Sequence, residues 1–345
     1  MDKDIARIET RFTRAYSVNH PIACAGLAFS GSNAALPIAV SEGGGIGAFG
    51  VGILPAEYLE RVVADIRRGT GKPFNINFIT LFVAESHIEA CVQLRPDIVS
   101  FHWGHPPRDW VRKLHSVGIK VWEQIGSADA AKLALDDGVD LLVAQGAEAG
   151  GHNFGTLPTF VGLPAIVDVA DGAMVLAAGG IADGRGLAAA LALGADGVWV
   201  GTRFAATREA NVPPPYYDAM VTARGEDTVL SSIFGRENPR FNPMRLLRNR
   251  LVAEYEGREE DAPVDLESQP VVGNIQVYDL TITAKKFSTL VPTSRTEGDF
   301  ESMPLLMGQG VGMVTDIPGA QEVLERMINQ ALKTMRKMHL GIVNE

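Results

Sequence analysis

The chain has 345 residues, of which 46% are hydrophobic, and its 31 basic against 41 acidic residues give a net charge of −10. This length exceeds that of a usual single domain and predicts one large barrel with an appendage. The acidic balance argues against nucleic-acid and anionic-membrane partners, which bind basic surfaces.

The cysteine content and the N-terminus limit the class of protein further. The only two cysteines, Cys24 and Cys91, lie far apart in the sequence, so neither a disulfide framework nor a zinc site is expected. The first twelve residues, MDKDIARIETRF, contain no apolar signal region, and no later run reaches ~18 apolar residues. We therefore expect a cytoplasmic protein without membrane or metal partners, and the sequence leaves homo-oligomerisation open.

Short apolar runs alternate with longer amphipathic segments from residue 20 onward. Eight runs are predicted as strands: Ile22–Ala25, Gly45–Ala48, Phe74–Asn77, Ile98–Phe101, Lys120–Glu123, Leu141–Ala144, Met174–Ala177 and Gly197–Val200. The helical patterns between them include Ala56–Arg68, Arg108–Ser116, Ala128–Asp136 and Arg185–Leu193. Eight strands joined through helices predict an α/β fold, a (β/α)8 TIM barrel with a C-terminal cap or lid region, because eight βα units close a barrel.

The alternation ends near residue 208, which sets the predicted domain boundaries. Residues 1–207 are predicted to form the barrel, 208–305 a cap on the substrate side, and 306–345 a C-terminal segment whose helix packs back on the barrel. That helix is predicted over Gly319–Met338, where apolar residues recur at helical spacing. Five arginines between Arg236 and Arg250 either contact an anionic ligand or, as the safer interpretation, form solvated ion pairs on the cap.

The stretch Leu141–His152, LLVAQGAEAGGH, carries the strongest chemical signal. Its apolar start is long enough for a strand buried on both faces, and the small residues after it let backbone approach a flat ligand. His152 ends this loop, and imidazole is the side chain best suited to proton transfer near neutral pH. We therefore predict a catalytic His152, against the alternative of a histidine that packs or caps locally.

Two further glycine-rich turns follow the seventh and eighth predicted strands. Gly179-Gly180 and Gly201-Thr202 offer backbone N–H groups and a hydroxyl to a phosphate dianion, at the strand pair where barrels commonly bind phosphate. Tight barrel turns are the alternative explanation. The earlier cluster Gly43–Gly47 precedes its strand, the wrong order for a dinucleotide site. We interpret it as close packing against a flat cofactor, with a plain turn as the alternative.

Seven strings, in this order, resemble the nitronate monooxygenases, formerly called 2-nitropropane dioxygenases: PIACAGLA, SEGGGIGAFG, KPFNINF, VSFHWGHPP, AQGAEAGGHNFG, AAGGIADGRGLAAALALGADGVWVGTRF and GQGVGM. The likeness covers most of residues 20–207 and resumes near residue 308. AQGxEAGGH together with AAGGIxDGRG is specific to this group of flavin barrels. The related flavin-type enoyl-acyl-carrier-protein reductases share much of the pattern, so the motifs mark the superfamily more firmly than the reaction.

The resemblance implies FMN across the barrel mouth and assigns roles to residues of this chain. His152 matches the family's catalytic histidine, which accepts a proton from the carbon beside a nitro group or binds the resulting anion. His102 and Leu27 become candidates for the substrate side, and no metal is implied. The cofactor-binding residues that the resemblance implies are Ala25, Asn77, Gln145, Gly150, Gly151, Gly179, Gly180, Gly201 and Thr202.

The chain also departs from the family pattern. Gly26-Leu27 stands where PMxG is usual, so the residue over the flavin is changed. Glu42 lies in SEGGG, where S-N-A-G-G is usual, and a carboxylate facing the site would disfavour an anionic substrate. Three other side chains have two interpretations each: His105 is structural or functional, Cys24 is core or flavin contact, and Glu148 is a solvated carboxylate or a ribityl partner.

We therefore expect an FMN-dependent enzyme that oxidises alkyl nitronates, or nitroalkanes, with oxygen to a carbonyl compound and nitrite. Its expected partners are this small-molecule substrate and oxygen, and the protein supplies position and electrostatics to the cofactor's chemistry. One alternative is an NAD(P)H-dependent flavin reductase acting on an enoyl thioester or a quinone, for which the cap arginines could line a groove. Another is a flavin-binding accessory protein without turnover, against which the intact His152 argues.

Overall fold

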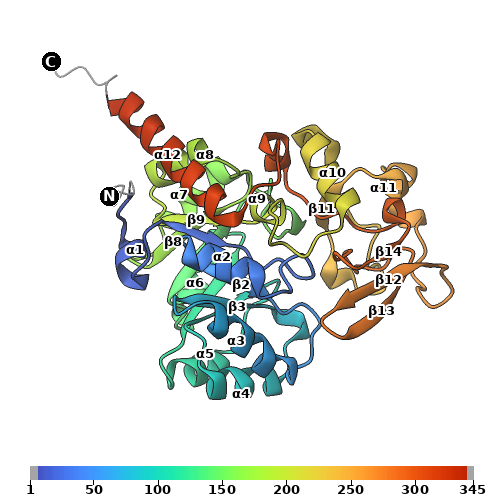
Figure 1. Cartoon of the computed structure of the whole chain (residues 1–345), viewed down its shortest axis with the longest axis horizontal. Coiled ribbons are helices and arrows are strands. Elements are labelled where there is room, and N and C mark those ends of the chain that lie inside the picture. Colours follow the sequence, from blue (N-terminus) through green and yellow to red (C-terminus); the bar gives the residue numbers. More distant parts are fainter. Residues whose placement is uncertain (1–6, 340–345) are drawn as a thin grey trace.

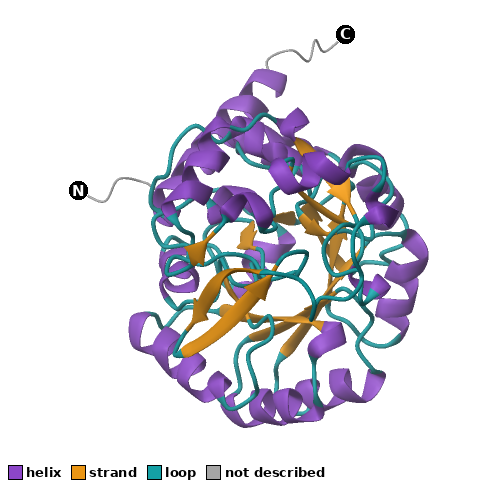
Figure 2. Cartoon of the chain, turned by 90° about the vertical axis from the view of Figure 1, so that its right-hand side faces the viewer, coloured by secondary structure: helices purple, strands orange, loops and turns teal. Residues whose placement is uncertain are grey.

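The computed structural model describes residues 7–339, and a closed ring of parallel strands forms their centre (Figures 1 and 2). The strands pair in the order β1-β9-β8-β6-β5-β4-β3-β2. A parallel bridge between Ala23 and Ile46 joins the first strand to the start of the second and closes the ring. The predicted (β/α)8 barrel is thereby confirmed. Its strands are β1 (Ile22–Cys24), β2 (Gly47–Gly50), β3 (Phe74–Ile79), β4 (Ile98–His102), β5 (Lys120–Ile125), β6 (Leu141–Gln145), β8 (Met174–Ala178) and β9 (Gly197–Val200).

A helix follows each barrel strand and covers its outer face. In α6 (Ala128–Asp136) the Ser127 hydroxyl accepts the Ala130 N–H, as an N-cap should. The remaining helices are α2 (Ala35–Glu42), α3 (Tyr58–Gly69), α4 (Glu85–Leu94), α5 (Arg108–His115), α7 (Thr159–Val167), α8 (Gly184–Ala192) and the short α9 (Thr202–Ala205). The predicted helices agree with these within two residues, but α7 was missed. It is apolar on all sides and contains Pro164, so it shows no helical periodicity.

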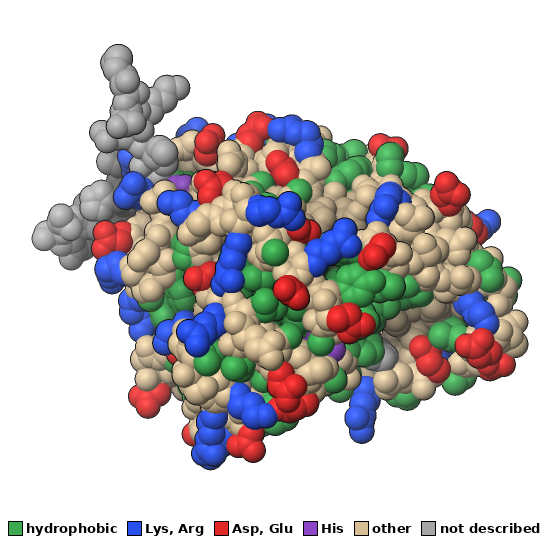
Figure 3. Space-filling view, turned by 60° about the horizontal axis from the view of Figure 1, so that its bottom comes forward, with side chains coloured by type: hydrophobic (Ala, Val, Ile, Leu, Met, Phe, Trp, Pro, Cys, Tyr) green, Lys and Arg blue, Asp and Glu red, His purple; other side chains and the backbone are tan. Residues whose placement is uncertain are grey.

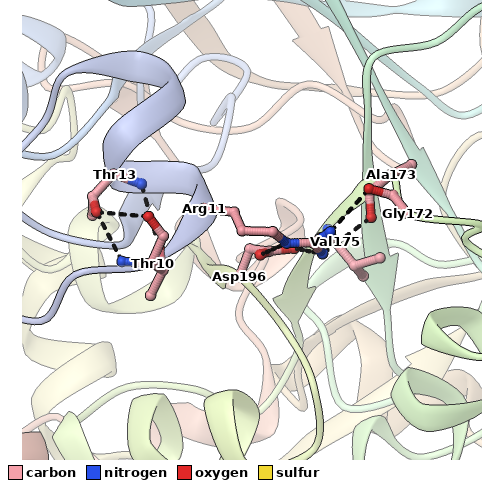
Figure 4. Close-up of polar contacts among 7 residues, drawn as sticks. All are labelled: Thr10, Arg11, Thr13, Gly172, Ala173, Val175 and Asp196. Atoms are coloured by element: carbon pink, nitrogen blue, oxygen red, sulfur yellow. Dashed lines mark hydrogen bonds and ion pairs between the residues drawn. The ribbon is translucent and has the colours of Figure 1, made fainter.

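The N-terminal helix α1 (Arg11–Tyr16) closes the end of the barrel where the strands begin. Its Phe12 and Tyr16 pack on Trp122, whose indole N–H donates to the Tyr16 hydroxyl at 2.6 Å. Arg11 pairs with Asp196 through Nε at 2.6 Å, and a second carboxylate oxygen accepts the Val175 N–H (Figure 4). Trp122 therefore belongs to the core at this end of the barrel.

The cap consists of two small antiparallel sheets and short helices inserted after β9. One sheet joins β10 (Thr228–Ser231) and β11 (Met244–Leu247) to β7 (Gly151–His152). The second sheet holds β12 (Val271–Val277), β13 (Leu280–Lys285) and β14 (Glu297–Gly298). The connecting helices are α10 (Pro214–Thr222), α11 (Arg250–Tyr255) and the 3-10 turns η2 (Gly225–Asp227), η3 (Pro239–Phe241), η4 (Glu259–Asp261), η5 (Phe300–Ser302) and η6 (Gln309–Met313). A further 3-10 turn, η1 (Thr80–Phe82), directly follows β3 of the barrel. The division of the chain at residues 208 and 306 stays a prediction.

The last described helix, α12 (Ala320–His339), packs on α8 and α2 at the side of the barrel away from β12–β14 (Figure 1). Its buried residues include Val323, Leu324, Met327 and Ile328, one apolar stripe at helical spacing. No helix within residues 7–339 has the length and apolar character to span a bilayer. On the face shown in Figure 3, basic and acidic side chains are interspersed, without a field of one sign.

The glycine cluster at Gly43–Gly47 corrects two expectations. It forms the turn between α2 and β2, where a Cβ on Gly43 would lie 2.5 Å from Leu324 of α12. This turn precedes its strand and therefore lies at the end of the barrel opposite the mouth, so the interpretation as packing against a cofactor is wrong. Glu42, the last residue of α2, is exposed and accepts the Thr70 hydroxyl. The strand itself begins at Gly47, two residues later than predicted.

Candidate active site

A deep cavity lies at the carboxyl ends of the barrel strands, where functional groups gather in this architecture. It encloses ≈ 1360 Å³, with the open solvent at its mouth included. The loops after β1, β6, β8 and β9 contribute most of its wall, and the cap adds Thr289–Val291, Leu306 and Gly308. All the predicted cofactor residues, and also His152, His102 and Leu27, line this cavity.

His152 lies half-buried at the rim of the β6 loop and is held by its backbone and its ring. The Gln145 side-chain amide donates to its carbonyl at 3.0 Å, and β7 pairs His152 with Met244 of the cap. The Trp103 indole lies against the imidazole, with ring centroids 4.8 Å apart. Because backbone and ring are both supported, the imidazole is presented to the cavity in a restricted set of orientations.

Trp103 connects this histidine to two other segments. Its indole stacks on Phe154, with centroids 3.9 Å apart and planes 5° from parallel, and its N–H donates to the carbonyl of Arg240. The ring is 1% exposed. Trp103 is thus a buried side chain that connects the β4 loop with the segment after β7 and with the cap turn η3. Its position beside His102 in the sequence does not reveal this role.

His102 occupies the end of β4 as a neutral imidazole. Burial, with the nearby His152 adding a smaller effect, lowers its pKa to about 4. Its Nδ1 lies 3.1 Å from the Phe78 carbonyl, and a carbonyl only accepts, so Nδ1 carries the proton. Nε2 is then an acceptor, which is the state in which His102 meets any ligand near neutral pH.

The glycine turns after β8 and β9 leave backbone exposed to the same cavity. Gly179 and Gly180 have φ of 104° and 67°, conformations that favour glycine. Gly201 precedes α9, whose first N–H groups have no partner inside the helix, and the Thr202 hydroxyl accepts the Gly308 N–H at 3.0 Å. A Cβ on Gly201 would meet only Ala25 and Leu27, at 3.6 Å. The space beside Gly201 can therefore accept a ligand group such as a phosphate.

Asn77 and Gln145 reach the cavity from the floor of the barrel. The Asn77 amide donates to Ser100 Oγ at 2.7 Å, which fixes its orientation. Gly26 packs so closely on Asn77 that a Cβ would lie 2.0 Å from its Oδ1. The departure at Gly26-Leu27 therefore has a packing reason, since glycine makes room for the Asn77 side chain.

Several residues with two sequence interpretations are now placed away from the cavity. His105 bonds Glu123 and Asp137, each at 2.9 Å, and is structural. Glu148 accepts the Thr159 N–H at 2.9 Å and so supports the start of α7, which is neither of its two interpretations. Cys24 is buried in the core. Trp199, by contrast, lines the cavity. Within the described residues there is no group of three His, Cys, Asp or Glu side chains able to hold a metal ion.

The cap arginines do not line a groove at the mouth. Arg236 donates to the Glu260 carbonyl at 2.7 Å, and Arg245 donates to the Ala147 carbonyl at 3.0 Å. Arg248 and Arg250 form ion pairs with Glu256 and Asp299. The interpretation as solvated ion pairs therefore describes Arg248 and Arg250, whereas Arg236 and Arg245 bond backbone carbonyls.

Part of the cavity wall was missed from the sequence. Gln124 lies one residue after the predicted end of its strand, which places it at the active end of the barrel, but it was not among the predicted site residues. Ile53, Phe82 and Leu290 also line the wall. They are ordinary apolar residues that distant parts of the chain bring together, and no local signal distinguishes them.

Known proteins resemble the chain over nearly all of its length. A family model described as nitronate monooxygenase matches residues 79–330. A nitronate monooxygenase of Pseudomonas aeruginosa is 30% identical over 93% of this chain and 98% of its own. The (3aS,4S,5R,7aS)-5-hydroxy-7a-methyl-1-oxo-octahydro-1H-indene-4-carboxyl-CoA dehydrogenase of Rhodococcus jostii is 27% identical over 95% and 97%. The structure of FabK from Thermotoga maritima superposes with a TM-score of 0.82 at 30% identity, covering 97% and 100%.

Proposed function

The chain belongs to the nitronate monooxygenase family and is a flavin-dependent oxidoreductase, and we propose that it binds FMN and oxidises alkyl nitronates, or their parent nitroalkanes, with oxygen. The products are a carbonyl compound and nitrite. Atoms and charge balance when two nitronate anions and one O2 give two carbonyl molecules and two nitrite ions. The observation that carries the proposal is that His152 and the glycine turns after β8 and β9 line one cavity.

The cofactor is proposed to lie along the β6, β8 and β9 loops. Bound FMN supplies an electron acceptor for the nitronate and an electron donor for oxygen. Backbone N–H groups at Gly179, Gly180, Gly201 and Thr202 are proposed to hold the phosphate, since no Lys or Arg lies among the described residues that line the cavity. Asn77 and Gln145 are proposed to bond the flavin ring or the ribityl chain, and the backbone of Ala25, Gly150 and Gly151 to contact the cofactor.

His152 is proposed as the base. It would take the proton from the carbon beside the nitro group of a neutral nitroalkane, and it would pair with a nitronate that arrives already ionised. His102 cannot share the first task well, because its lowered pKa makes it a weak base. We propose that His102 accepts hydrogen bonds on the substrate side while Leu27 packs against the substrate.

The test is anaerobic reduction of the bound flavin. Protein loaded with FMN is mixed with a small alkyl nitronate in the absence of oxygen, and the flavin absorbance is followed. Loss of absorbance with the nitronate alone, and nitrite and carbonyl release when oxygen is added, are expected. Retention of the oxidised spectrum with every nitronate would contradict the proposal.

A second candidate is an NAD(P)H-dependent reductase. The likeness to FabK and to the Rhodococcus CoA dehydrogenase favours it, whereas the partnered cap arginines do not offer a nucleotide groove. Parallel anaerobic samples with NADH and NADPH separate the candidates. Reduction by a nicotinamide alone would favour the reductase and direct the search to enoyl thioesters and quinones.

A further inference from the structure

The loop that leads from β6 to His152 is built almost entirely from small residues. Between Gly146 and Gly151 the only side chain larger than a methyl group is that of Glu148, and its carboxylate accepts the Thr159 N–H at the start of α7. Small side chains provide no apolar core that could fix the path of the loop. The shape of the loop therefore depends on where its backbone N–H and C=O groups find hydrogen-bond partners.

The side-chain amide of Asn153 lies inside this loop and bonds its backbone. Asn153 is 5% exposed. Its Nδ2 lies 3.2 Å from each of three carbonyl oxygens, those of Gly146, Ala147 and Ala149. Its Oδ1 accepts the Gly155 N–H at 2.8 Å. Three acceptors on one side and an N–H donor on the other fix the orientation of the amide, and the two amide hydrogens are shared among the three carbonyls.

Asn153 directly follows His152, and the two side chains point in opposite directions. β7 ends at His152, and successive side chains of an extended segment alternate between its two faces. The His152 side chain lines the cavity, whereas that of Asn153 lies within the loop. The backbone of Asn153 is held as well, since its N–H donates to the Pro243 carbonyl of the cap at 3.3 Å. A displacement of Asn153 therefore also displaces the backbone that carries the imidazole.

We propose that Asn153 is a positioning residue for His152: its buried amide fixes the course of the loop over residues 146–155 and thereby the place of the imidazole in the cavity. The proposal rests on the proposed function, in which His152 is the base. Proton transfer depends strongly on such placement, because a misplacement of about 1 Å can cost about 10²-fold in rate.

The rates on two forms of one substrate separate positioning from a general loss of structure. Nitrite release by the FMN-loaded protein is measured with a small neutral nitroalkane, which must lose a proton, and with its nitronate, which has already lost it. Asn153→Ala is expected to lower the ratio of the two kcat/KM values, neutral over ionised, by at least about tenfold. A smaller folded or FMN-loaded fraction lowers both values by the same factor and leaves the ratio unchanged. An unchanged ratio in Asn153→Ala would overturn the proposal.

Asn249→Ala is the matched control. Asn249 is 4% exposed, donates from Nδ2 to the Met303 carbonyl at 2.8 Å and accepts the Val252 N–H at 3.1 Å. It is an equally buried amide that joins segments of the cap, and none of these three residues lines the cavity. The ratio in Asn249→Ala should stay at the parent value, and an equal fall in both variants would overturn the proposal.

Asn153→Asp covers the case in which Asn153→Ala does not fold. It keeps the shape of the side chain and the acceptor for the Gly155 N–H, but it places an oxygen where the donor faces the three carbonyls. We expect the ratio to fall here as well, by at least about fivefold. A ratio at the parent value in this variant would equally overturn the proposal.

The place of the imidazole can also be followed without turnover. The Trp103 and His152 ring centroids are 4.8 Å apart, so the ring current of the indole shifts the NMR resonances of the carbon-bound imidazole protons. Protein with isotope-labelled histidine shows these resonances, and His152→Ala identifies them by their loss. They are expected to shift in Asn153→Ala and to keep their place in Asn249→Ala. If no nitronate is oxidised, the proposed function fails, and this measurement still decides the role of Asn153, because unmoved His152 resonances would overturn it.

Discussion

The indole of Trp103 lies against the imidazole of His152, with ring centroids 4.8 Å apart and planes tilted by 45°. The same indole stacks on Phe154 and donates its N–H to the Arg240 carbonyl. The orientation of the proposed base therefore depends on a side chain that is buried behind it and on a turn of the cap.

Trp103→Phe tests this dependence. The change keeps an apolar ring but removes the N–H donor and part of the stack, so we expect kcat to fall by about tenfold through misalignment while KM changes by less than about twofold. Trp110→Phe is the control, because it also loses an indole hydrogen bond, 2.7 Å to Glu85, away from the cavity. Unchanged kcat in a folded Trp103→Phe protein would show that the contact does not position His152.

His152→Ala is expected to lower kcat/KM for a neutral nitroalkane by about 10²–10⁴-fold, the usual contribution of a general base. The fall with a nitronate that is already ionised should be smaller, because no proton has to be removed. Initial rates of nitrite release give both values. His115→Ala, which disturbs a histidine paired with Asp140 at 2.7 Å outside the cavity, should leave both unchanged. Full activity of His152→Ala on the neutral substrate would refute the assignment.

Gly201→Ala should weaken FMN binding without harming the apoprotein. The Gly201 φ is −99°, which alanine adopts, and the new methyl would meet only Ala25 and Leu27 at 3.6 Å. It would nonetheless occupy space beside the proposed phosphate position, and we expect the Kd of FMN to rise at least about tenfold. Fluorescence titration measures the Kd, and thermal unfolding of the apoprotein checks the fold. Gly71→Ala, at a site with nothing within 4 Å, is the control.

Glu123 gives the protein a pH-dependent stability. Burial raises its pKa to about 7, and although burial alone lowers the pKa of His105, the hydrogen bond to Asp137 and the charge of Glu123 outweigh that effect and raise it. Both folded-state pKa values lie above the unfolded ones. The stabilisation from the protonated Glu123 carboxyl is thus fully present below about pH 4.5 and is lost as the pH rises toward and through about 7.

Glu123→Gln isolates the carboxyl contribution. Between pH 5 and 8 the free energy of unfolding of the parent protein should fall, relative to that of the variant, by on the order of 2–3 kcal/mol. Urea denaturation across this range measures the difference. Glu85→Gln, at an exposed carboxylate bonded to Lys113 and Trp110, should show little slope there. Parallel curves for the parent and Glu123→Gln would contradict the prediction.

The barrel could be predicted from the sequence because strands buried on both faces are short apolar runs that stand out between polar helices. The prediction was less accurate where the contrast between apolar strands and polar helices was weak. The Gly43–Gly47 cluster moved the predicted start of β2 two residues too early, since glycine adapts to a turn as readily as to a strand. In α7, Pro164 and an apolar surface on all sides concealed the helix.

The candidate site could be predicted where its residues lie in loops directly after strands. His152, His102 and the two glycine turns are of this kind, and the barrel brings them to one end. Leu290 and Leu306 follow no such rule, because their place at the mouth depends on how the cap folds back. The burial of Glu123 was equally hidden, since a carboxylate on a strand is ordinarily exposed.

The order of the chain separates the barrel part of the cavity wall from its cap part. Every barrel strand is complete by Val200, whereas the cap residues of the cavity wall fall within the single stretch 289–310. Residues 289–310 could be exchanged as one segment between relatives without any change in the sequence of the β6, β8 or β9 loops. An exchanged segment would have to preserve two contacts with the barrel loops, the bond from the Gly308 N–H to the Thr202 hydroxyl and the bond from the Gln309 N–H to the Glu148 carbonyl. The cap part of the cavity wall can therefore be replaced as one block rather than by scattered point changes.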